Sequence, residues 1–172
     1  IFAHLSLTHR RAPGWMGAIE RLYATPEASG APAGRIEMRK GVLLLPLRAP
    51  TLPPFTHTNC FIVGGADIVV VDPGSPYDDE QTKLHAFVDA LLREGRTLRA
   101  VLLTHYHGDH VGGAAAFRAR FGTRVFAHAE TAKRLDAGVV DDVIPDAHTF
   151  ALDGAGGFRL RSLFTPGHAP GH

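Results

Sequence analysis

The sequence has few of the features that mark a secreted, membrane-spanning or nucleic-acid-binding chain. It contains a single cysteine, Cys60, so no disulfide can form within the chain and nothing points to an oxidising compartment. No apolar run approaches the roughly 20 residues of a transmembrane helix, and no signal peptide is visible. The formal net charge is +1 with the charges interspersed, which gives no reason to expect a nucleic acid or a membrane as partner. We therefore expect a cytoplasmic protein.

Histidine is the residue type that stands out against an otherwise ordinary composition. Apolar residues make up 45% of the chain and charged residues 20%, which is the balance of a folded protein and not of a disordered one. The chain has 11 histidines, and five of them fall in two short stretches. These stretches are LLTHYHGDHVGG at 102–113 and TPGHAPGH at 165–172. They are the candidate functional motifs.

The first 34 residues differ from the rest of the chain. The segment PEASGAPAG at 26–34 is rich in proline, glycine and alanine, which is typical of a flexible linker. We interpret residues 1–34 as an N-terminal extension or the end of an upstream domain, followed by a folded domain at 35–172. Nothing in the sequence indicates the oligomeric state.

From residue 35 onward, β-branched and apolar runs alternate with segments of helical periodicity. The run FIVGGADIVVVD predicts a hairpin with its turn at the glycine pair. The segment PGSPYDDE predicts the start of a helix with Ser75 as N-cap, and Gly95 predicts its end. Strands mixed with helices indicate an α+β or α/β arrangement. We expect strands at 36–47, 59–63, 98–105, 124–128, 148–153 and 158–164, and further helices at 112–122 and 129–135.

Three imidazoles and a carboxylate lie within the six residues His105-x-His107-x-Asp109-His110. In a helix these side chains would diverge, whereas in a loop leaving a strand the first two point to one side and the last two turn toward a neighbouring point. The apolar strand before the motif and the glycines after it favour the loop, and Gly108 is expected to relax the backbone there. Imidazole and carboxylate both suit zinc. This layout is typical of a two-metal site.

One loop does not complete such a site, so a further ligand must come from elsewhere in the fold. The sequence TPGH at 165–168 also follows a predicted strand. Its Pro-Gly pair predicts a tight turn that presents His168. We therefore expect His168 to join the histidines of the first motif.

The segments FIVGGADIVVVDPG, THYHGDHVGG and TPGHAPGH together resemble the metallo-β-lactamase superfamily, in the family's order. Within it the chain is most similar to glyoxalase II-like hydrolases and to a related group of endoribonuclease-type members. The resemblance implies an α+β fold, the αββα sandwich, with the metals at one edge between the sheets. It also implies that the sandwich is truncated after the TPGH motif, because the family's bridging aspartate and last histidine ligand would lie beyond His172.

The resemblance assigns metal ligands residue by residue. It implies that His105, His107 and His168 bind the first metal, and that Asp109 and His110 bind the second. Zinc is the expected metal, with two ions in the intact protein and iron or manganese as alternatives.

Two further residues are expected to support the site without binding metal. Asp72, in VVDPG, corresponds to the family's aspartate that orients the metal loop, although on residues alone it is equally a turn residue before Pro73. His172 follows the ligand histidine in the TPGHxxGH pattern and is expected to be supporting.

The function that follows is metal-dependent hydrolysis of a small-molecule substrate by a zinc-bound hydroxide, which Asp109 orients as the catalytic residue. The glyoxalase II-like resemblance favours a thioester or related ester. One alternative is an endoribonuclease-type phosphodiesterase, which would make a nucleic acid the partner. Another is a persulfide dioxygenase of the same fold with a single iron, since a site of two histidines and one carboxylate favours iron.

Overall fold

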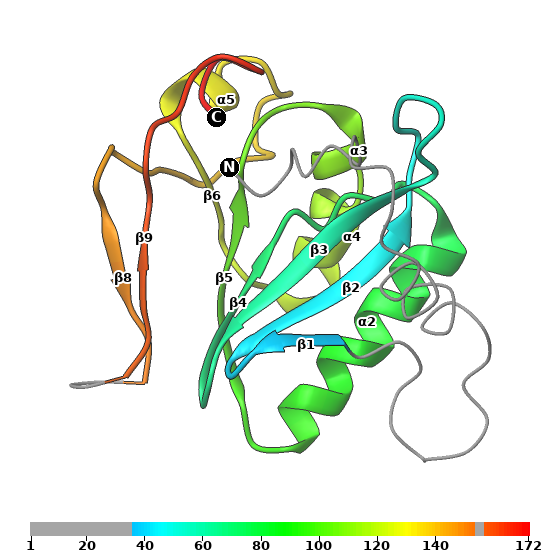
Figure 1. Ribbon diagram of the computed structural model, residues 1–172, viewed down its shortest axis with the longest axis vertical. Coiled ribbons are helices and arrows are strands. Elements are labelled where there is room, and N and C mark those ends of the chain that lie inside the picture. Colours follow the sequence, from blue (N-terminus) through cyan, green and yellow to red (C-terminus); the bar gives the residue numbers. More distant parts are fainter. Residues whose placement is uncertain (1–35, 154–156) are drawn as a thin grey trace, which may run out of the picture. The chain divides into compact units, whose positions relative to one another are not determined.

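The structure, a computed structural model, describes residues 36–153 and 157–172, so the expected extension at 1–34 lies outside the described residues. Its main feature is a seven-stranded sheet in the order β1-β2-β3-β4-β5-β6-β7, accompanied by a two-stranded sheet of β8 and β9 (Figure 1). The strands are β1 (Ile36–Arg39), β2 (Val42–Arg48), β3 (His57–Gly64), β4 (Asp67–Val71), β5 (Thr97–Leu103), β6 (Val125–Ala127), β7 (Asp142–Val143), β8 (Thr149–Ala151) and β9 (Arg159–Arg161). The helices are α2 (Asp78–Arg93), α3 (Gly108–Val111), α4 (Ala114–Phe121) and α5 (Ala129–Ala132).

Strand direction places several strand ends at one edge of the large sheet. β1 to β4 are antiparallel neighbours, and the predicted hairpin between β3 and β4 is confirmed. β4, β5, β6 and β7 run parallel. The carboxyl ends of β4, β5 and β6 therefore meet at the same edge, which is where open sheets of this kind place their functional residues. In Figure 1, α3, α5 and the C-terminal turn (residues 165–172) lie in the upper part of the view.

Helix α2 covers the large sheet with the apolar face that its periodicity predicts, and Gly95, at φ +92°, follows its end as expected. The predicted N-cap is wrong. The helix begins at Asp78, and Ser75 is buried, with its Oγ accepting a hydrogen bond from the backbone N–H of Tyr77 at 3.2 Å. Ser75 therefore stabilises a turn that precedes the helix. The buried residues of α2 are Leu84, Phe87, Val88 and Leu91.

Some strand boundaries also differ from the expectation. The single strand expected at 36–47 is two strands, β1 and β2, joined by a tight turn in which Gly41 has φ +75°. The two-residue strand β7 was not predicted, because a segment this short carries no periodicity. The expected strand pair near the end of the chain is present, with β8 and β9 antiparallel.

The described helices are short. The longest, α2, has 16 residues, and α4 has 8 and is followed by Gly122 in the left-handed conformation. None of the helices in the described part of the chain has the length and apolar character needed to cross a membrane.

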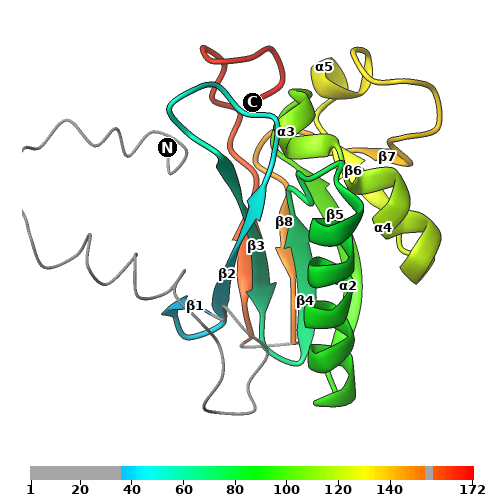
Figure 2. The same ribbon diagram turned by 90° about the vertical axis from the view of Figure 1, so that its right-hand side faces the viewer.

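Two apolar cores lie on opposite faces of the large sheet. The first is formed with α2 and α4, which Figure 2 shows along the sheet, and it contains Leu45, Val70 and Cys60. The second lies toward β8 and β9 and contains Val69 and Leu152. Adjacent residues of β4 thus belong to different cores, as the two-residue period of a strand dictates. The described residues form a helix layer, a large sheet and a small sheet, which confirms the α+β class and agrees with the expected sandwich truncated after the TPGH motif.

Candidate metal centre

Segments far apart in the sequence meet at the edge where the parallel strands end. Asp72 directly follows β4, the motif from His105 to His110 follows β5, and His168 lies in the turn after β9. The three segments are the ones singled out from the sequence. The convergence of the first two segments follows from the parallel pairing of β4 with β5, which brings the ends of both strands to one point.

His105, His107 and His168 form a group of potential metal ligands, with one donor atom from each within 4.8 Å of the others. The Nε2 of His105 lies 3.0 Å from the Nδ1 of His107, which in turn lies 3.1 Å from the Nε2 of His168. A tetrahedral zinc ion bound at about 2.0–2.1 Å holds its nitrogen ligands roughly 3.3 Å apart. Two of the three separations are therefore close to those of nitrogens that share a metal.

The Asp72 carboxylate connects the end of β4 to the histidine motif. Its Oδ1 accepts a hydrogen bond from the backbone N–H of Thr104 at 2.8 Å, and its Oδ2 accepts one from the Thr104 hydroxyl at 2.6 Å. The same Oδ2 lies 2.9 Å from Nδ1 of His110. Asp72 is 4% exposed and has φ +53°, a left-handed conformation that aspartate tolerates better than most residues. The residue is both a turn residue and a hydrogen-bonding partner of the motif.

Asp109 and His110 lie beside the three-histidine group and not within it. His110 Nε2 is 3.8 Å from Asp109 Oδ2, and the rings of His110 and His105 are 4.1 Å apart between centroids. The hydroxyl of Thr58 on β3 donates to Asp109 Oδ2 at 3.3 Å. These two side chains thus offer a nitrogen and an oxygen next to the three-histidine group.

The motif is partly helical, which differs from the expected loop. The residues before Gly108 are irregular, whereas Gly108 to Val111 form the short helix α3. A Cβ added at Gly108 would meet no atom within 4 Å. The expected need for glycine at this position is therefore wrong, because the backbone there is helical and uncrowded.

The glycines that the site does need are Gly74 and Gly113. A Cβ on Gly74 would lie 2.0 Å from the backbone oxygen of Asp109, and a Cβ on Gly113 would lie 2.3 Å from the backbone oxygen of Pro73. Gly113 also donates its N–H to Pro73 at 2.8 Å. The turn after β4 and the histidine motif therefore touch backbone to backbone.

Burial keeps two of the imidazoles uncharged at neutral pH. Burial, followed by the neighbouring imidazoles of His110 and His107, lowers the pKa of His105 to about 3. Burial and then His168 also lower the pKa of His107. At His110 burial lowers the pKa, but the hydrogen bond and charge of Asp72 outweigh it and leave the pKa raised. Neutral imidazole is the form that binds a metal, so His105 and His107 are in the ligand form.

His172 lies at the rim of the group. Its ring centroid is 5.3 Å from that of His105 and 6.0 Å from that of His168. Its Nδ1 lies 3.3 Å from the hydroxyl of Thr165, at the other end of the C-terminal turn. The geometry is compatible with the expected supporting position, which stays a prediction.

Three threonines that contact the site segments were not among the residues predicted from the sequence. Thr104 touches both Asp72 and the Nδ1 of His105, at 3.0 Å for the latter, and its position directly before the motif was a usable signal. Thr58 on β3 and Thr131 on α5 carry no such signal, because only the folded chain brings them to the motifs.

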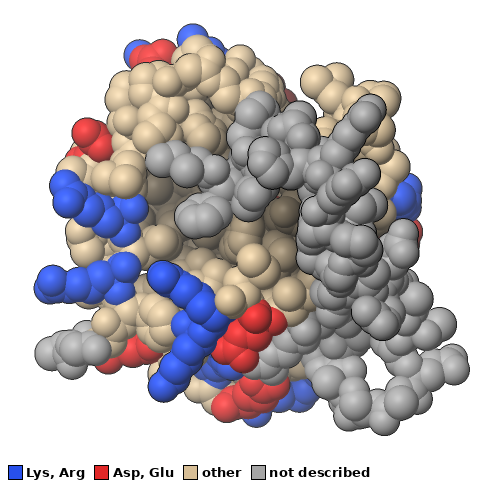
Figure 3. Space-filling model, viewed as in Figure 1, with Lys and Arg blue, Asp and Glu red and all other residues tan. Residues whose placement is uncertain are grey.

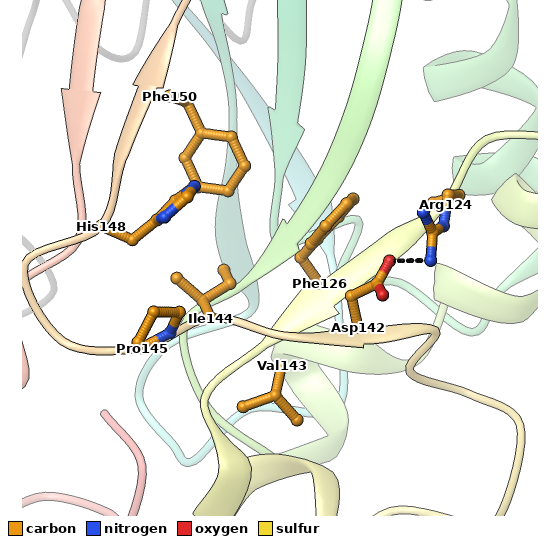
Figure 4. A pocket seen from close by; sticks show the side chains of 8 residues that line it. All are labelled: Arg124, Phe126, Asp142, Val143, Ile144, Pro145, His148 and Phe150. Carbon is orange, nitrogen blue, oxygen red and sulfur yellow. Dashed lines mark ion pairs between the residues drawn. The ribbon is translucent and has the colours of Figure 1, made fainter.

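A separate cavity of about 230 Å³ lies between β6, β7 and β8, and none of the predicted site residues lines it. In Figure 4, Phe150 and His148 face Phe126 across the cavity, and an ion pair of Arg124 and Asp142 stands at its side. This cavity is therefore not the place of the expected metal chemistry.

The family model of the metallo-beta-lactamase superfamily matches residues 53–172. A hydroxyacylglutathione hydrolase of Acidiphilium cryptum is 40% identical over 87 residues, which are 51% of this chain and 34% of the relative. An atrochrysone carboxyl ACP thioesterase of Passalora fulva is 34% identical over 119 residues, which are 69% of this chain and 33% of the relative.

The fold is also similar to solved structures. A metallo-beta-lactamase of Cronobacter sakazakii superposes with a TM-score of 0.62 at 22% identity, over 80% of this chain and 56% of that protein. The matched part of the chain spans from 31% to 57% of the length of the curated relatives. The match to the family model covers the segment that holds the histidine motifs.

Proposed function

The chain belongs to the metallo-beta-lactamase superfamily, and from this premise we propose that it carries metal ligands of a zinc-dependent hydrolase that cleaves a thioester or related ester. The observation that carries the proposal is the convergence of one nitrogen each from His105, His107 and His168 within 4.8 Å. The motifs that supply these nitrogens are separated by 61 residues between His107 and His168. Such a convergence of imidazoles suits a divalent metal ion.

The donor atoms fit zinc in number and in chemistry. The Nδ1 of His105 is engaged by Thr104, which leaves its Nε2 to face the other rings. The Nδ1 of His110 is engaged by Asp72, which leaves its Nε2 on the side of Asp109. Outer partners of this kind orient metal-binding histidines. We propose one zinc on the three-histidine group and a second on Asp109 and His110, with ligands beyond this chain completing the set.

The chemistry divides between the metal and the chain's own residues. Zinc bound there would supply a nucleophile at neutral pH, because the ion lowers the pKa of a water molecule to about 7. The Asp109 carboxylate, which accepts a hydrogen bond from the Thr58 hydroxyl, would orient that nucleophile. Asp72 keeps His110 in a fixed orientation through its 2.9 Å contact. No serine or cysteine nucleophile is required.

A thioester is the proposed substrate class. Two relatives that share the matched segment are named as a hydroxyacylglutathione hydrolase and an ACP thioesterase, and both names describe cleavage of an acyl group from a thiol carrier. We extend this chemistry to the present protein because the family match at residues 53–172 includes both histidine motifs. The substrate itself is proposed as a small molecule or carrier-bound acyl group.

Charge distribution gives the endoribonuclease alternative no support. On the face shown in Figure 3, Lys and Arg side chains stand beside Asp and Glu instead of forming a continuous basic surface. Arg99 and Asp67, for example, pair at 2.7 Å. A nucleic-acid backbone binds best to an unbroken basic surface. The dioxygenase alternative differs in its metal, which makes metal content the first discriminating measurement.

The test is elemental analysis and hydrolysis assays on the full-length protein. We expect about two zinc ions per chain, together with hydrolysis of acyl thioesters that a chelator abolishes and zinc restores. His107→Ala should lose this turnover, whereas His148→Ala, in the separate cavity, should keep it. One iron per chain with oxygen uptake on persulfides, or cleavage of RNA without thioester hydrolysis, would replace the proposal by the corresponding alternative.

A further inference from the structure

The turn that carries His168, residues 165–172, is closed by a backbone hydrogen bond from the Thr165 N–H to the His172 carbonyl at 2.7 Å. Within residues 165–172 the buried residues are Ala169 and Gly171, whereas His168 itself is exposed. The position of its imidazole therefore depends on what holds these buried residues. Gly171 packs against α5, as its contacts with Glu130 and Thr131 show.

Thr131 of α5 makes the contact with Gly171. Its side chain is fully buried, and its hydroxyl donates a hydrogen bond to the Gly171 carbonyl at 3.2 Å. Gly171 has φ +85°, and a Cβ on it would lie 2.5 Å from the Thr131 hydroxyl and 2.6 Å from the Thr131 nitrogen. The backbone of the turn thus rests directly on α5, with the threonine hydroxyl as the polar link between them.

Helix α5 is itself fixed to the strand that carries the other ligands. It follows β6, which pairs in parallel with β5, so that Leu103 stands opposite Ala127. His128 caps the helix, accepting from the Glu130 N–H at 3.2 Å. The ring of His128 stacks on Phe164 at 4.5 Å. A single short element therefore links the end of β5 to both sides of the C-terminal turn.

We propose that Thr131 is a positioning residue for His168. Its buried hydroxyl fixes the Gly171 carbonyl and thereby sets the distance of the His168 imidazole from the histidines that follow β5. The inference rests on the metal site proposed above. It adds a residue, on an element outside both histidine motifs, that controls how tightly the metal is bound.

The experiment measures zinc affinity in the full-length protein by competition with a chromophoric chelator. Thr131→Val keeps the shape of the side chain and removes the hydroxyl, and we expect zinc affinity to fall about 10-fold or more, as for other partners of metal ligands. Thr131→Ser keeps the hydroxyl and should restore affinity. Thr123→Val is the matched control, because Thr123 is a buried threonine that precedes β6 at the end opposite α5.

A double-mutant cycle of Thr131→Val with His168→Ala separates an effect on the position of His168 from a general loss of stability. If Thr131 acts through His168, its substitution by valine should weaken zinc binding in the parent protein and leave affinity unchanged in the His168→Ala background. A purely structural effect would lower affinity equally in both backgrounds. The visible spectrum of the cobalt-substituted protein gives a second readout, which should change in Thr131→Val and not in Thr123→Val.

The outcomes distinguish this inference from the proposed function. A parent protein that binds no metal would overturn the proposed function and this inference with it. A parent that binds zinc, with a Thr131→Val variant of equal affinity and unchanged cobalt spectrum, would overturn the inference alone. If the valine variant does not fold, Thr131→Ala, which adds no atoms, takes its place in the same cycle.

Discussion

Asp72 is the side chain on which the hydrogen bonds of the site meet. Its two oxygens accept hydrogen bonds from the backbone N–H and the hydroxyl of Thr104, and one of them also lies beside the Nδ1 of His110. Thr104 in turn touches His105. A carboxylate has the acceptor positions for all these partners, and a neutral amide does not.

At the residue scale we therefore predict that Asp72→Asn keeps the fold and weakens metal binding. Asparagine tolerates the left-handed backbone at φ +53°, but its NH₂ group cannot accept a hydrogen bond from Thr104 or His110. Zinc affinity should fall about 10- to 100-fold, as expected when a partner of a metal ligand is lost. Chelator competition measures the change.

A second left-handed aspartate provides the control for this substitution. Asp153, at φ +66°, accepts the N–H of Gly65 near the start of β4, whereas Asp72 follows the end of that strand. Asp153→Asn should leave zinc affinity unchanged. Equal affinities of both variants and the parent would make Asp72 a turn residue only.

At the element scale, the site depends on the close contact between the turn after β4 and the start of α3. Gly74 has no room for a side chain, because the Asp109 carbonyl occupies the place of its Cβ.

We predict that Gly74→Ala moves the motif and destabilises the protein, whereas Gly108→Ala does not. A Cβ 2.0 Å from a backbone oxygen forces a backbone shift, and such overpacking costs about 1–3 kcal/mol. Gly108 is helical with open space around it, so alanine there should be neutral or stabilise by up to about 1 kcal/mol. Urea unfolding of the metal-free proteins measures both. Similar losses in the two variants would contradict the packing argument.

At the scale of the whole molecule, one sheet separates two apolar cores. Leu45 belongs to the core under α2 and α4, and Leu152 belongs to the core toward β8 and β9. Both side chains are at most 2% exposed. The backbone of the sheet lies between them, so they share no packing partner across it.

We predict that Leu45→Ala and Leu152→Ala each lower the free energy of unfolding by about 2–5 kcal/mol. Their effects should add within about 0.5 kcal/mol in the double variant, because distant sites without shared neighbours are independent. Leu52→Ala, at a side chain that is 81% exposed, should change stability by no more than about 0.5 kcal/mol. Chemical unfolding of the full-length protein provides these values, and a strongly non-additive double variant would show that the two cores are coupled.

Much of the fold follows from patterns within short windows of sequence. The hairpin of β3 and β4 and the apolar face of α2 depend on period and on turn residues, which local steric and solvation preferences decide. The membership of His105, His107, Asp109 and His110 in one candidate site is equally local, since six consecutive residues cannot lie far apart. The start of α2 was not predictable in this way, because Ser75 is buried with its backbone oxygen against Gly113 of the distant motif and does not cap the helix.

The sequence by itself therefore determined the elements and the residue types that are able to bind a metal. Only the tertiary structure decided how they meet. His168 and His107 are 61 residues apart in the sequence. Their approach depends on the parallel pairing of β5 with β6 and on the hydrogen bond from Thr131 of α5 to Gly171. Packing in the folded chain likewise decides that position 74 needs a glycine and that position 108 does not. Distances between segments depend on strand pairing and packing, and these are properties of the folded chain that no local window contains.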